Sequence, residues 1–411
     1  MTTFIAAGSN LKNRPDNLRT AVQLLQQKRY VIDEVSPVYE TPAALLYETA
    51  QDEWNTPYLN CIFKMHTSCD AFHLLADLKE IERQMGRDFS KRWAPRPIDL
   101  DIIKHNEDKI DTTELHIPHK LYLERSFVLD PLSFFASVPP KALYTPSHQP
   151  MIMGILNITP DSFSDGGKNN QTENFKQKFL LWEKSLVPLI DIGAESTRPN
   201  AVPLNAEDEI KRLEKVFSFT ASLKKDFFSP RLSIDTYHWK TARTALQNGF
   251  EIINDVHGLD DPNMLAVAKD NKNNPCIFMH HDDLSRVSLK ETITTIRHWL
   301  EDRLNLFEQN GLKRQNLIFD PGIGFGKSAC QSLQILQNLN AFHHFGVRLL
   351  IGHSRKSFMK IFTPKQPPQK DTETLAVSLK IAPKTDILRV HTPIEHKEAL
   401  LAAAHAENQF F

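Results

Sequence analysis

Residues 251–280 read EIINDVHGLDDPNMLAVAKDNKNNPCIFMH and contain one period of the pattern that decides the fold of the second half of the chain. Two short apolar runs, EIIND and CIFMH, flank a longer stretch with helical character. Similar β-rich runs recur at residues 152–157, 187–192, 231–235, 251–255, 276–280, 316–320, 348–352 and 387–391. Eight buried strands separated by helices predict a (β/α)8 TIM barrel.

Most of these runs end in a polar residue. At the last or next-to-last positions stand Asn157, Asp191, Asp235, Asn254, His280, Asp320, Gly352 and His391. An Asp or Asn after a strand also caps the following helix, which is the simpler explanation for any single residue. Because nearly every run ends this way, we instead expect a polar pocket at the C-terminal rim, where barrel enzymes place their catalytic groups.

The first part of the chain follows a different rhythm. Runs at 4–7, 30–39, 58–66 and 98–103 predict strands, and the stretches 13–28 and 70–85 predict helices. This β-α-β-β-α-β order is typical of the ferredoxin-like α+β fold. Such a fold has an antiparallel sheet with helices packed on one face.

A proline-rich stretch separates the two patterns. Residues 137–150 read SVPPKALYTPSHQP, and four prolines without any period suit a linker. We therefore predict a first domain over residues 1–138, a linker over 139–150 and a second domain over 151–411. A length of 411 residues is also too long for one typical core.

The composition of the chain indicates which classes of partner and which cellular compartment to expect. Lys plus Arg number 49 and Asp plus Glu number 50, so the net charge is 49 − 50 = −1 and neither nucleic acid nor an anionic membrane is expected as a partner. The start MTTFIAAGSN lacks the basic region of a signal peptide. Four cysteines without a CxxC pair predict reduced thiols and a cytoplasmic protein.

Two aspartates form the first chemical pattern. Asp99 and Asp101 lie two apart on a predicted strand, so both carboxylates point to the same side. A lone Asp-x-Asp is more often an exposed acidic face, but here cationic residues surround it in the sequence: Arg87, Arg92, Arg96, Lys120 and Arg125. Carboxylates that hold Mg²⁺ and guanidinium groups that bind phosphates predict a nucleotide site without a P-loop.

The stretch Arg92–Ile102 (RWAPRPIDLDI) resembles hydroxymethyldihydropterin pyrophosphokinase. Shorter matches are AGSNL at 7–11, ETP at 40–42, YLN at 58–60, Glu82 with Gly86-Arg87, and IPH at 117–119. Together they span nearly all of residues 1–135. The resemblance implies transfer of a pyrophosphoryl group from ATP to the hydroxymethyl group of 6-hydroxymethyl-7,8-dihydropterin.

The same resemblance implies roles for individual residues. Two magnesium ions would lie on Asp99 and Asp101, with Arg87 and Arg96 as catalytic groups. The expected ATP contacts are Arg87, Trp93, Arg96, His119 and Arg125. The expected pterin contacts are Thr41, Pro42, Tyr58, Asn60 and Phe127. Three positions depart from the family pattern: Lys79, Phe89 and Lys120.

Glycine-rich and basic segments follow the barrel strands. The segment 320–328 (DPGIGFGKS) is not a P-loop, because Pro321 stands where the first glycine is required, but its glycines permit close approach of the backbone. The runs 354–357 (SRKS) and 389–391 (RVH) follow the last two strands, the usual phosphate-binding place in barrels. An anion site is therefore predicted there.

These segments resemble dihydropteroate synthase. The motifs NITPDSFSDGG, DIGAESTRP, SIDT, IND, DPGIGFGK, GHSRKS and RVH appear in the order of that family over residues 151–391. The resemblance implies condensation of p-aminobenzoate with the pterin pyrophosphate, which releases pyrophosphate and forms 7,8-dihydropteroate. It also implies a homodimer formed through the barrel.

Residue roles follow from that resemblance. The pterin contacts would be Asp235, Asn254, Met279, Asp320 and Lys356, and the pyrophosphate contacts Asn157, Arg389 and His391. The p-aminobenzoate contacts would be Thr197, Arg198, Pro199, Phe325 and Ser357. Asn157 would also hold one magnesium ion, and Asp320, Lys356 and Arg198 would be catalytic. Thr392 stands where the family usually has an aspartate.

Other interpretations remain open at this stage. The stretch His280–Asp283 (HHDD) suggests zinc, but neighbouring residues on a strand point in opposite directions. The barrel could bind a pterin for methyl transfer, although that chemistry does not need the anion site predicted at SRKS and RVH. One half could also be a non-catalytic scaffold, against which the retained Asp99, Asp101, Arg198 and Lys356 argue.

Overall fold

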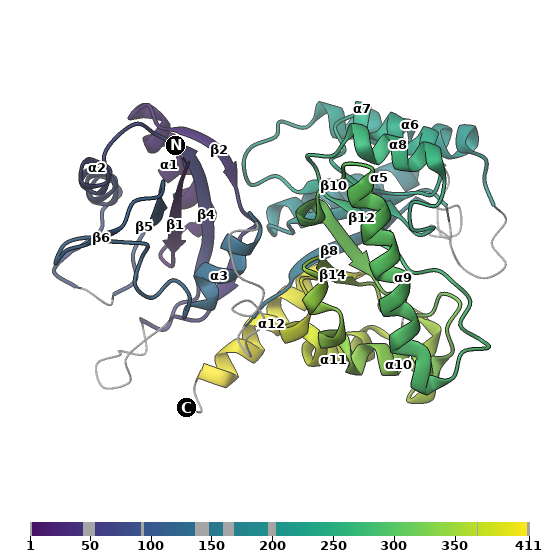
Figure 1. Cartoon of the computed structure of the whole chain (residues 1–411). Coiled ribbons are helices and arrows are strands. Elements are labelled where there is room, and N and C mark those ends of the chain that lie inside the picture. Colours follow the sequence, from purple (N-terminus) through teal and green to yellow (C-terminus); the bar gives the residue numbers. More distant parts are fainter. Residues whose placement is uncertain are drawn as a thin grey trace. The chain divides into compact units, whose positions relative to one another are not determined.

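The computed structural model describes residues 2–43, 54–91, 94–135, 148–158, 168–195, 203–367 and 369–408. The chain forms two compact units, residues 1–149 with 398–411 and residues 150–397 (Figure 1). Most of the predicted linker, 139–150, lies outside the described residues.

In its described residues, the N-terminal unit contains an antiparallel sheet and the helices α1 to α3. Its strands are β1 (Thr2–Ser9), β2 (Val31–Val35), β3 (Tyr39–Thr41), β4 (Tyr58–His66), β5 (Asp99–His105), β6 (Ile110–Asp111) and β7 (His116–Ile117). Its helices are α1 (Arg14–Gln27), α2 (Ala71–Gln84) and α3 (Ser126–Ser133). The main sheet has the order β2-β4-β1-β5 with β3 paired to β4, and β6 pairs with β7.

The strand predicted over 30–39 is wrong as a single element, because the chain leaves the sheet between β2 and β3. Pro37 lies in this gap and lacks the N–H that a paired strand requires. Ser36 binds β4 instead, with its N–H donating to the Ile62 carbonyl (2.9 Å) and its hydroxyl accepting from the Ile62 N–H (2.8 Å). The predicted strand is therefore two strands.

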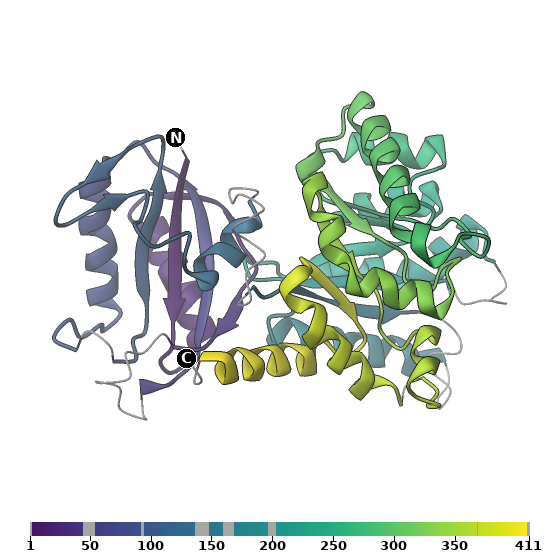
Figure 2. The same ribbon diagram turned by 60° about the horizontal axis from the view of Figure 1, so that its bottom comes forward.

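Helices cover both faces of this sheet. The helices α1 and α2 lie side by side and pack on one face (Figure 2). The third helix, α3, buries Val128 and Leu132 against Ile62 and Ile103 together with Phe4. These residues belong to the opposite face, since Phe4 alternates with the buried Ile5 along β1. The expectation of helices on one face only is thus incorrect.

The second unit is a barrel of parallel strands surrounded by helices. The strands are β8 (Met151–Asn157), β9 (Leu189–Gly193), β10 (Arg231–Asp235), β11 (Ile252–Asp255), β12 (Cys276–Met279), β13 (Leu317–Asp320), β14 (Arg348–Ile351) and β15 (Ile387–Val390). The helices are α5 (Lys168–Lys184), α6 (Ala206–Ser222), α7 (Trp239–Gln247), α8 (Pro262–Asp270), α9 (Leu289–Gln309), α10 (Ala329–Gln337), α11 (Asp371–Ile381) and α12 (Pro393–Asn408).

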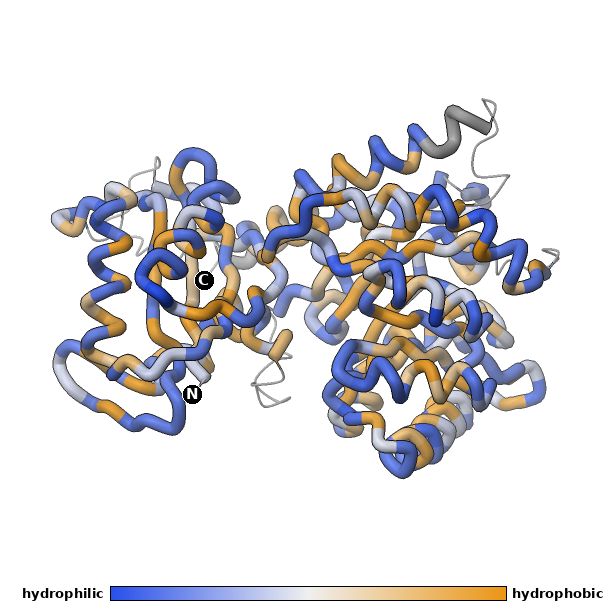
Figure 3. Tube along the Cα trace, turned by 90° about the horizontal axis from the view of Figure 1, so that it is seen from above, coloured by the Kyte–Doolittle hydropathy of each residue, from blue (hydrophilic) through white to orange (hydrophobic). Residues whose placement is uncertain are grey.

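The eight strands close into one barrel in sequence order, with β15 paired to β8, which confirms the predicted TIM barrel. Each strand begins and ends within two residues of its predicted range. Apolar residues concentrate on the strands and on the inward sides of the helices (Figure 3). Among the described helices, none combines the length and the apolar character needed to cross a membrane.

Candidate active sites

The N-terminal unit contains a cavity of about 340 Å³ beside strand β5, which we call the N-terminal cavity. Eleven residues with predicted roles line it: Thr41, Pro42, Tyr58, Asn60, Arg87, Arg96, Asp99, Asp101, His119, Arg125 and Phe127. Trp93 lies outside the described residues. Residues that are far apart in the sequence thus meet in one cavity.

Two arginines bind one of the two aspartates on β5. Arg87 Nη1 lies 2.5 Å from one oxygen of Asp99, and Arg96 Nη1 lies 3.2 Å from the other. Burial, and then the neighbouring charge of Asp99, raise the pKa of Asp101. A divalent cation between these carboxylates would stabilise their ionised forms, so the residues fit the predicted magnesium site.

A buried glutamate lies behind this pair. Glu82, on α2, is fully buried, and its Oε1 accepts hydrogen bonds from Leu100 N (2.7 Å), Arg87 (2.6 Å) and Lys79 (3.0 Å). Burial raises the pKa of Glu82, and the two cations oppose this shift. Glu82 therefore ties β5 to α2 and orients Arg87. Apart from the family match, no sequence pattern predicts this role of Glu82.

The departures from the family pattern have separate structural settings. Lys79 lines the cavity and binds Glu82. Phe89 lies under the Arg87 guanidinium, 5.1 Å from its carbon to the ring centre. Lys120 lies 3.6 Å from Asp111 in an exposed ion pair and is not among the residues that line the cavity.

Two other polar residues that line the N-terminal cavity, Asn60 and His119, are oriented by hydrogen bonds. Asn60 donates its amide N–H to the Thr41 hydroxyl (2.8 Å). Burial lowers the pKa of His119, which favours the neutral ring. Because His119 Nδ1 accepts from Leu121 N (3.2 Å), that ring carries its proton on Nε2 and can donate it to an anion.

At the barrel rim, four residues form a hydrogen-bonded group that we call the strand-end network: Asp191, Asp235, Asn254 and Arg389. Arg389 Nε donates to Asp191 (2.6 Å) and Nη2 donates to Asp235 (2.5 Å). Asn254 Nδ2 donates to the same oxygen of Asp191 (2.9 Å). The network thus joins β9, β10, β11 and β15.

One guanidinium serves two buried carboxylates in this network. Burial raises the pKa of Asp235 to about 7, an effect that Arg389 opposes and the charge of Asp191 increases. Asp191 is fully buried, and its Oδ1 has no hydrogen-bond partner among the described protein atoms. Asp191 is one of the strand-end residues expected in the polar pocket, but no ligand was predicted for it.

A second group gathers around Asp320 at the end of β13. The Asp320 carboxylate accepts from Gly322 N (2.8 Å), and burial raises its pKa. Burial also lowers the pKa of Lys356 to about 8, opposed by Asp320. Lys356 Nζ donates to the Ile323 carbonyl (2.6 Å) and lies 4.2 Å from the centre of the Phe325 ring.

The remaining predicted rim residues fall into three cases. Asn157 and Met279 end their strands, and Ser357 is exposed at the start of a short 3₁₀ helix, Ser357–Ile361. The His391 ring bonds to the Ser354 hydroxyl (2.8 Å), so the two predicted anion-binding segments meet. Thr197, Arg198 and Pro199 lie outside the described residues.

The HHDD stretch does not assemble a metal site. Within the described part of the chain, no three His, Cys, Asp or Glu side chains gather in a way that could hold a metal ion. His280 is fully buried and packs edge-on against Trp299, with ring centres 4.9 Å apart. Burial lowers the pKa of His280 to about 3, so it is a neutral core residue.

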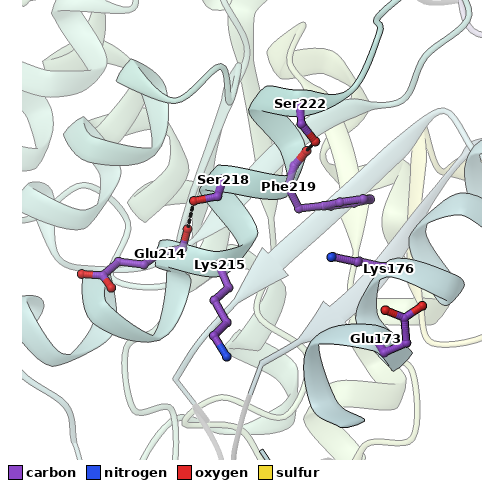
Figure 4. A pocket seen from close by; sticks show the side chains of 7 residues that line it. All are labelled: Glu173, Lys176, Glu214, Lys215, Ser218, Phe219 and Ser222. Atoms are coloured by element: carbon purple, nitrogen blue, oxygen red, sulfur yellow. Dashed lines mark hydrogen bonds between the residues drawn. The ribbon is translucent and has the colours of Figure 1, made fainter. Parts of the chain in front are cut away.

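A further groove lies between α5 and α6 and contains none of the predicted residues (Figure 4). Its two serine hydroxyls, those of Ser218 and Ser222, donate to carbonyls of their own helix. Lys176 lies 5.7 Å from the centre of the Phe219 ring. This groove is on the helical layer rather than at the strand ends, and its polar groups do not converge on one point.

Comparisons with known proteins agree with this arrangement. Residues 4–137 match the family model of 7,8-dihydro-6-hydroxymethylpterin-pyrophosphokinase, and residues 153–391 match that of pterin binding enzymes. The chain is 32% identical to the folate synthesis bifunctional protein of Chlamydia muridarum, over 98% of this chain and 99% of that protein. A folate synthesis bifunctional protein of Arabidopsis thaliana is 30% identical, over 97% and 95%.

Solved structures resemble the barrel unit. Dihydropteroate synthase from Xanthomonas albilineans, solved with 4-aminobenzoic acid, has a TM-score of 0.58 and 31% identity, and covers 64% of this chain and 94% of its own. Dihydropteroate synthase from Anaplasma phagocytophilum, solved with 6-hydroxymethylpterin-monophosphate, has a TM-score of 0.56 and 33% identity over 63% and 99%.

Proposed function

The chain belongs to the family of folate synthesis bifunctional proteins, and from this premise we propose which residues perform its two reactions. The first unit is a pyrophosphokinase that transfers a pyrophosphoryl group from ATP to 6-hydroxymethyl-7,8-dihydropterin. The second is a dihydropteroate synthase that condenses the product with p-aminobenzoate and releases pyrophosphate.

In the kinase, residues of the N-terminal cavity position ATP and the pterin and neutralise the negative charge of the phosphates. Arg87, Arg96, Arg125 and the Nε2–H of His119 bind the ATP phosphates, while the pterin lies against Tyr58, Asn60 and Phe127 with Thr41 and Pro42 beside it. Asp99 and Asp101 would hold Mg²⁺, and a bound Mg²⁺ would supply positive charge to the phosphates. The convergence of carboxylates and cations in one cavity carries this assignment.

In the synthase, the strand-end network and Asp320 surround the pterin. Asp235, Asn254 and Lys356 offer donors and acceptors to its polar edge, with Met279 packed against its ring. Arg389 bonds the carboxylates through Nε and Nη2, so its Nη1 faces the leaving pyrophosphate together with His391 and Asn157. Asn157 would also be the protein ligand of one Mg²⁺.

Charge at the reacting carbon explains the role of Asp320. When pyrophosphate leaves, the pterin methylene carries positive charge that delocalises into the ring. A buried carboxylate at the end of β13 stabilises that charge, and groups that bind pyrophosphate stabilise the opposite charge of the leaving group. The p-aminobenzoate amine then attacks the methylene, with its ring at Phe325 and its carboxylate near Ser357, Thr197, Arg198 and Pro199.

We further propose that the barrel forms a homodimer and that the protein acts in the cytoplasm. The second proposal is supported by the four cysteines, all of which are free: Cys61, Cys69, Cys276 and Cys330. Size-exclusion chromatography with light scattering tests the dimer directly.

Two half-reaction assays on full-length variants test the residue assignment. Asp101→Asn should lower formation of the pterin pyrophosphate by at least about a hundredfold, because charge stabilisation at the phosphates is lost. Lys356→Met should lower condensation by a similar factor, measured with ready-made pterin pyrophosphate.

Each variant has a matched control in the same chain. Asp88→Asn and Lys360→Met change exposed residues outside the two sites, and each should retain both activities. Each catalytic variant should also keep the activity of the other unit. If Asp101→Asn still forms pterin pyrophosphate at the wild-type rate and Lys356→Met still catalyses condensation at the wild-type rate, the assignment is contradicted.

A further inference from the structure

The backbone of the loop between Asp320 and Lys327 contacts the backbone of the segment that follows β12. His280 N donates to the Asp320 carbonyl (2.9 Å), and Leu284 N donates to the Gly326 carbonyl (2.6 Å). Gly322 has a φ of +73°, and a Cβ atom there would lie 2.0 Å from the His280 oxygen. The position of this loop therefore depends on close contacts along its whole length.

One side chain from the end of the loop returns to this contact. Lys327 Nζ donates to the His280 carbonyl (3.0 Å) and to the Phe325 carbonyl (2.8 Å). Among the described residues, no carboxylate lies within ion-pair distance of it. Burial lowers the pKa of Lys327 to about 7, and even the neutral amine has the two N–H groups that these carbonyls require.

A second lysine holds the loop from the other side. Lys356, which follows β14, donates to the Ile323 carbonyl (2.6 Å) and places its Nζ 4.2 Å from the centre of the Phe325 ring. Phe325 is thus fixed twice, through its carbonyl by Lys327 and through its ring by Lys356. The loop cannot shift without breaking one of these contacts.

We propose that Lys327 is a positioning residue of the synthase, which ties the Phe325 carbonyl to the end of β12 and so holds the Phe325 ring under Lys356 as a wall of the p-aminobenzoate pocket. This inference rests on the proposed function, which places Phe325 and Lys356 at the substrates. Among the proposed pterin contacts, Asp235 and Asn254 belong to other strands, and Met279 and Asp320 are held by the pairing of β12 with β13, so loss of the Lys327 bonds acts on p-aminobenzoate first.

Steady-state kinetics on the full chain test this role with ready-made pterin pyrophosphate. Lys327→Met keeps the length of the side chain but removes both donors, and the KM for p-aminobenzoate should rise about tenfold. The KM for pterin pyrophosphate should change less than about twofold. Lys327→Gln keeps an N–H donor and should recover part of the loss. A role in folding alone would instead lower the thermal midpoint and the apparent kcat and leave both KM values unchanged.

The variant Phe325→Leu distinguishes the positioning role of Lys327 from the assignment of Phe325 to the p-aminobenzoate pocket. If it raises the KM for p-aminobenzoate while Lys327→Met does not, the pocket assignment stands and the Lys327 inference fails. If Phe325→Leu leaves this KM unchanged, the pocket assignment and the inference both fail. Should Lys327→Met not fold, Lys327→Gln decides, because an unchanged KM for p-aminobenzoate in that variant also overturns the inference.

Discussion

At the scale of single residues, burial raises the pKa of two barrel carboxylates, Asp235 and Asp320, although cations lie beside both. Arg389 lies between Asp191 and Asp235, and Asp320 lies beside Lys356. The ion pairs and hydrogen bonds of these groups offset only part of the free energy that is lost when their charges are buried. Such a site is poised to accept the positive charge that develops on the pterin, at a cost to the stability of the free protein.

That cost should appear as a pH dependence of unfolding. The pKa of Asp235 rises from 3.8 to about 7 in the folded state, so between about pH 4 and pH 7 the folded protein keeps a proton that the unfolded chain has lost. Stability from this group is present at low pH and is lost as the pH rises to 7. Asp235→Asn should therefore reduce the fall in unfolding free energy between pH 5 and pH 7.5 by on the order of 2–4 kcal/mol.

Calorimetry or chemical denaturation at the two pH values measures this difference. The matched control is Asp302→Asn, at an exposed position of α9, which should show the same fall as the wild-type chain. An identical pH dependence in Asp235→Asn and the wild type would contradict the raised pKa.

The residues that the sequence identified and those that it missed differ in one physical respect. Asp99 and Asp101 are two apart on one strand, so local geometry predicts their common direction. Asp191 and Arg389 are 198 positions apart, and their contact depends on the closure of the barrel. Lys327 and Glu82 stand in recognisable motifs, but each also bonds a backbone atom of another element, which the motif does not reveal.

At the scale of elements, periodicity predicted every barrel strand because each is a short apolar run buried on both sides. It failed where a local feature interrupts a pattern, as Pro37 does between β2 and β3. It also missed α3, an eight-residue helix with Pro131 inside it, which is too short for a clear helical period.

The loop after β13 allows a direct test of an element. Gly322→Ala places a Cβ atom 2.0 Å from the His280 oxygen at a φ of +73°, so the loop must move. We expect a loss of unfolding free energy above about 3 kcal/mol and loss of synthase activity, with kinase activity retained.

Gly311→Ala is the matched control for this change. Gly311 also has a positive φ, +81°, but nothing lies within 4 Å of the position of its Cβ atom. It should therefore cost only the backbone strain, about 1–2 kcal/mol, and leave both activities in place. Equal effects of the two substitutions on the thermal midpoint and on synthase activity would mean that the close approach to His280 is unimportant.

At the scale of the whole molecule, the sequence predicted two folds and two chemistries, and the chain belongs to a bifunctional family. The first unit makes the pterin pyrophosphate that the second consumes.

The most direct test is one coupled assay on the purified full-length protein. The mixture contains 6-hydroxymethyl-7,8-dihydropterin, ATP, Mg²⁺ and radiolabelled p-aminobenzoate, and labelled 7,8-dihydropteroate is measured. We expect labelled product that requires ATP, and that Asp101→Asn abolishes unless pterin pyrophosphate is supplied ready-made. Absence of product from the complete mixture, with product formed only from ready-made pterin pyrophosphate, would contradict the claim that one chain catalyses both steps.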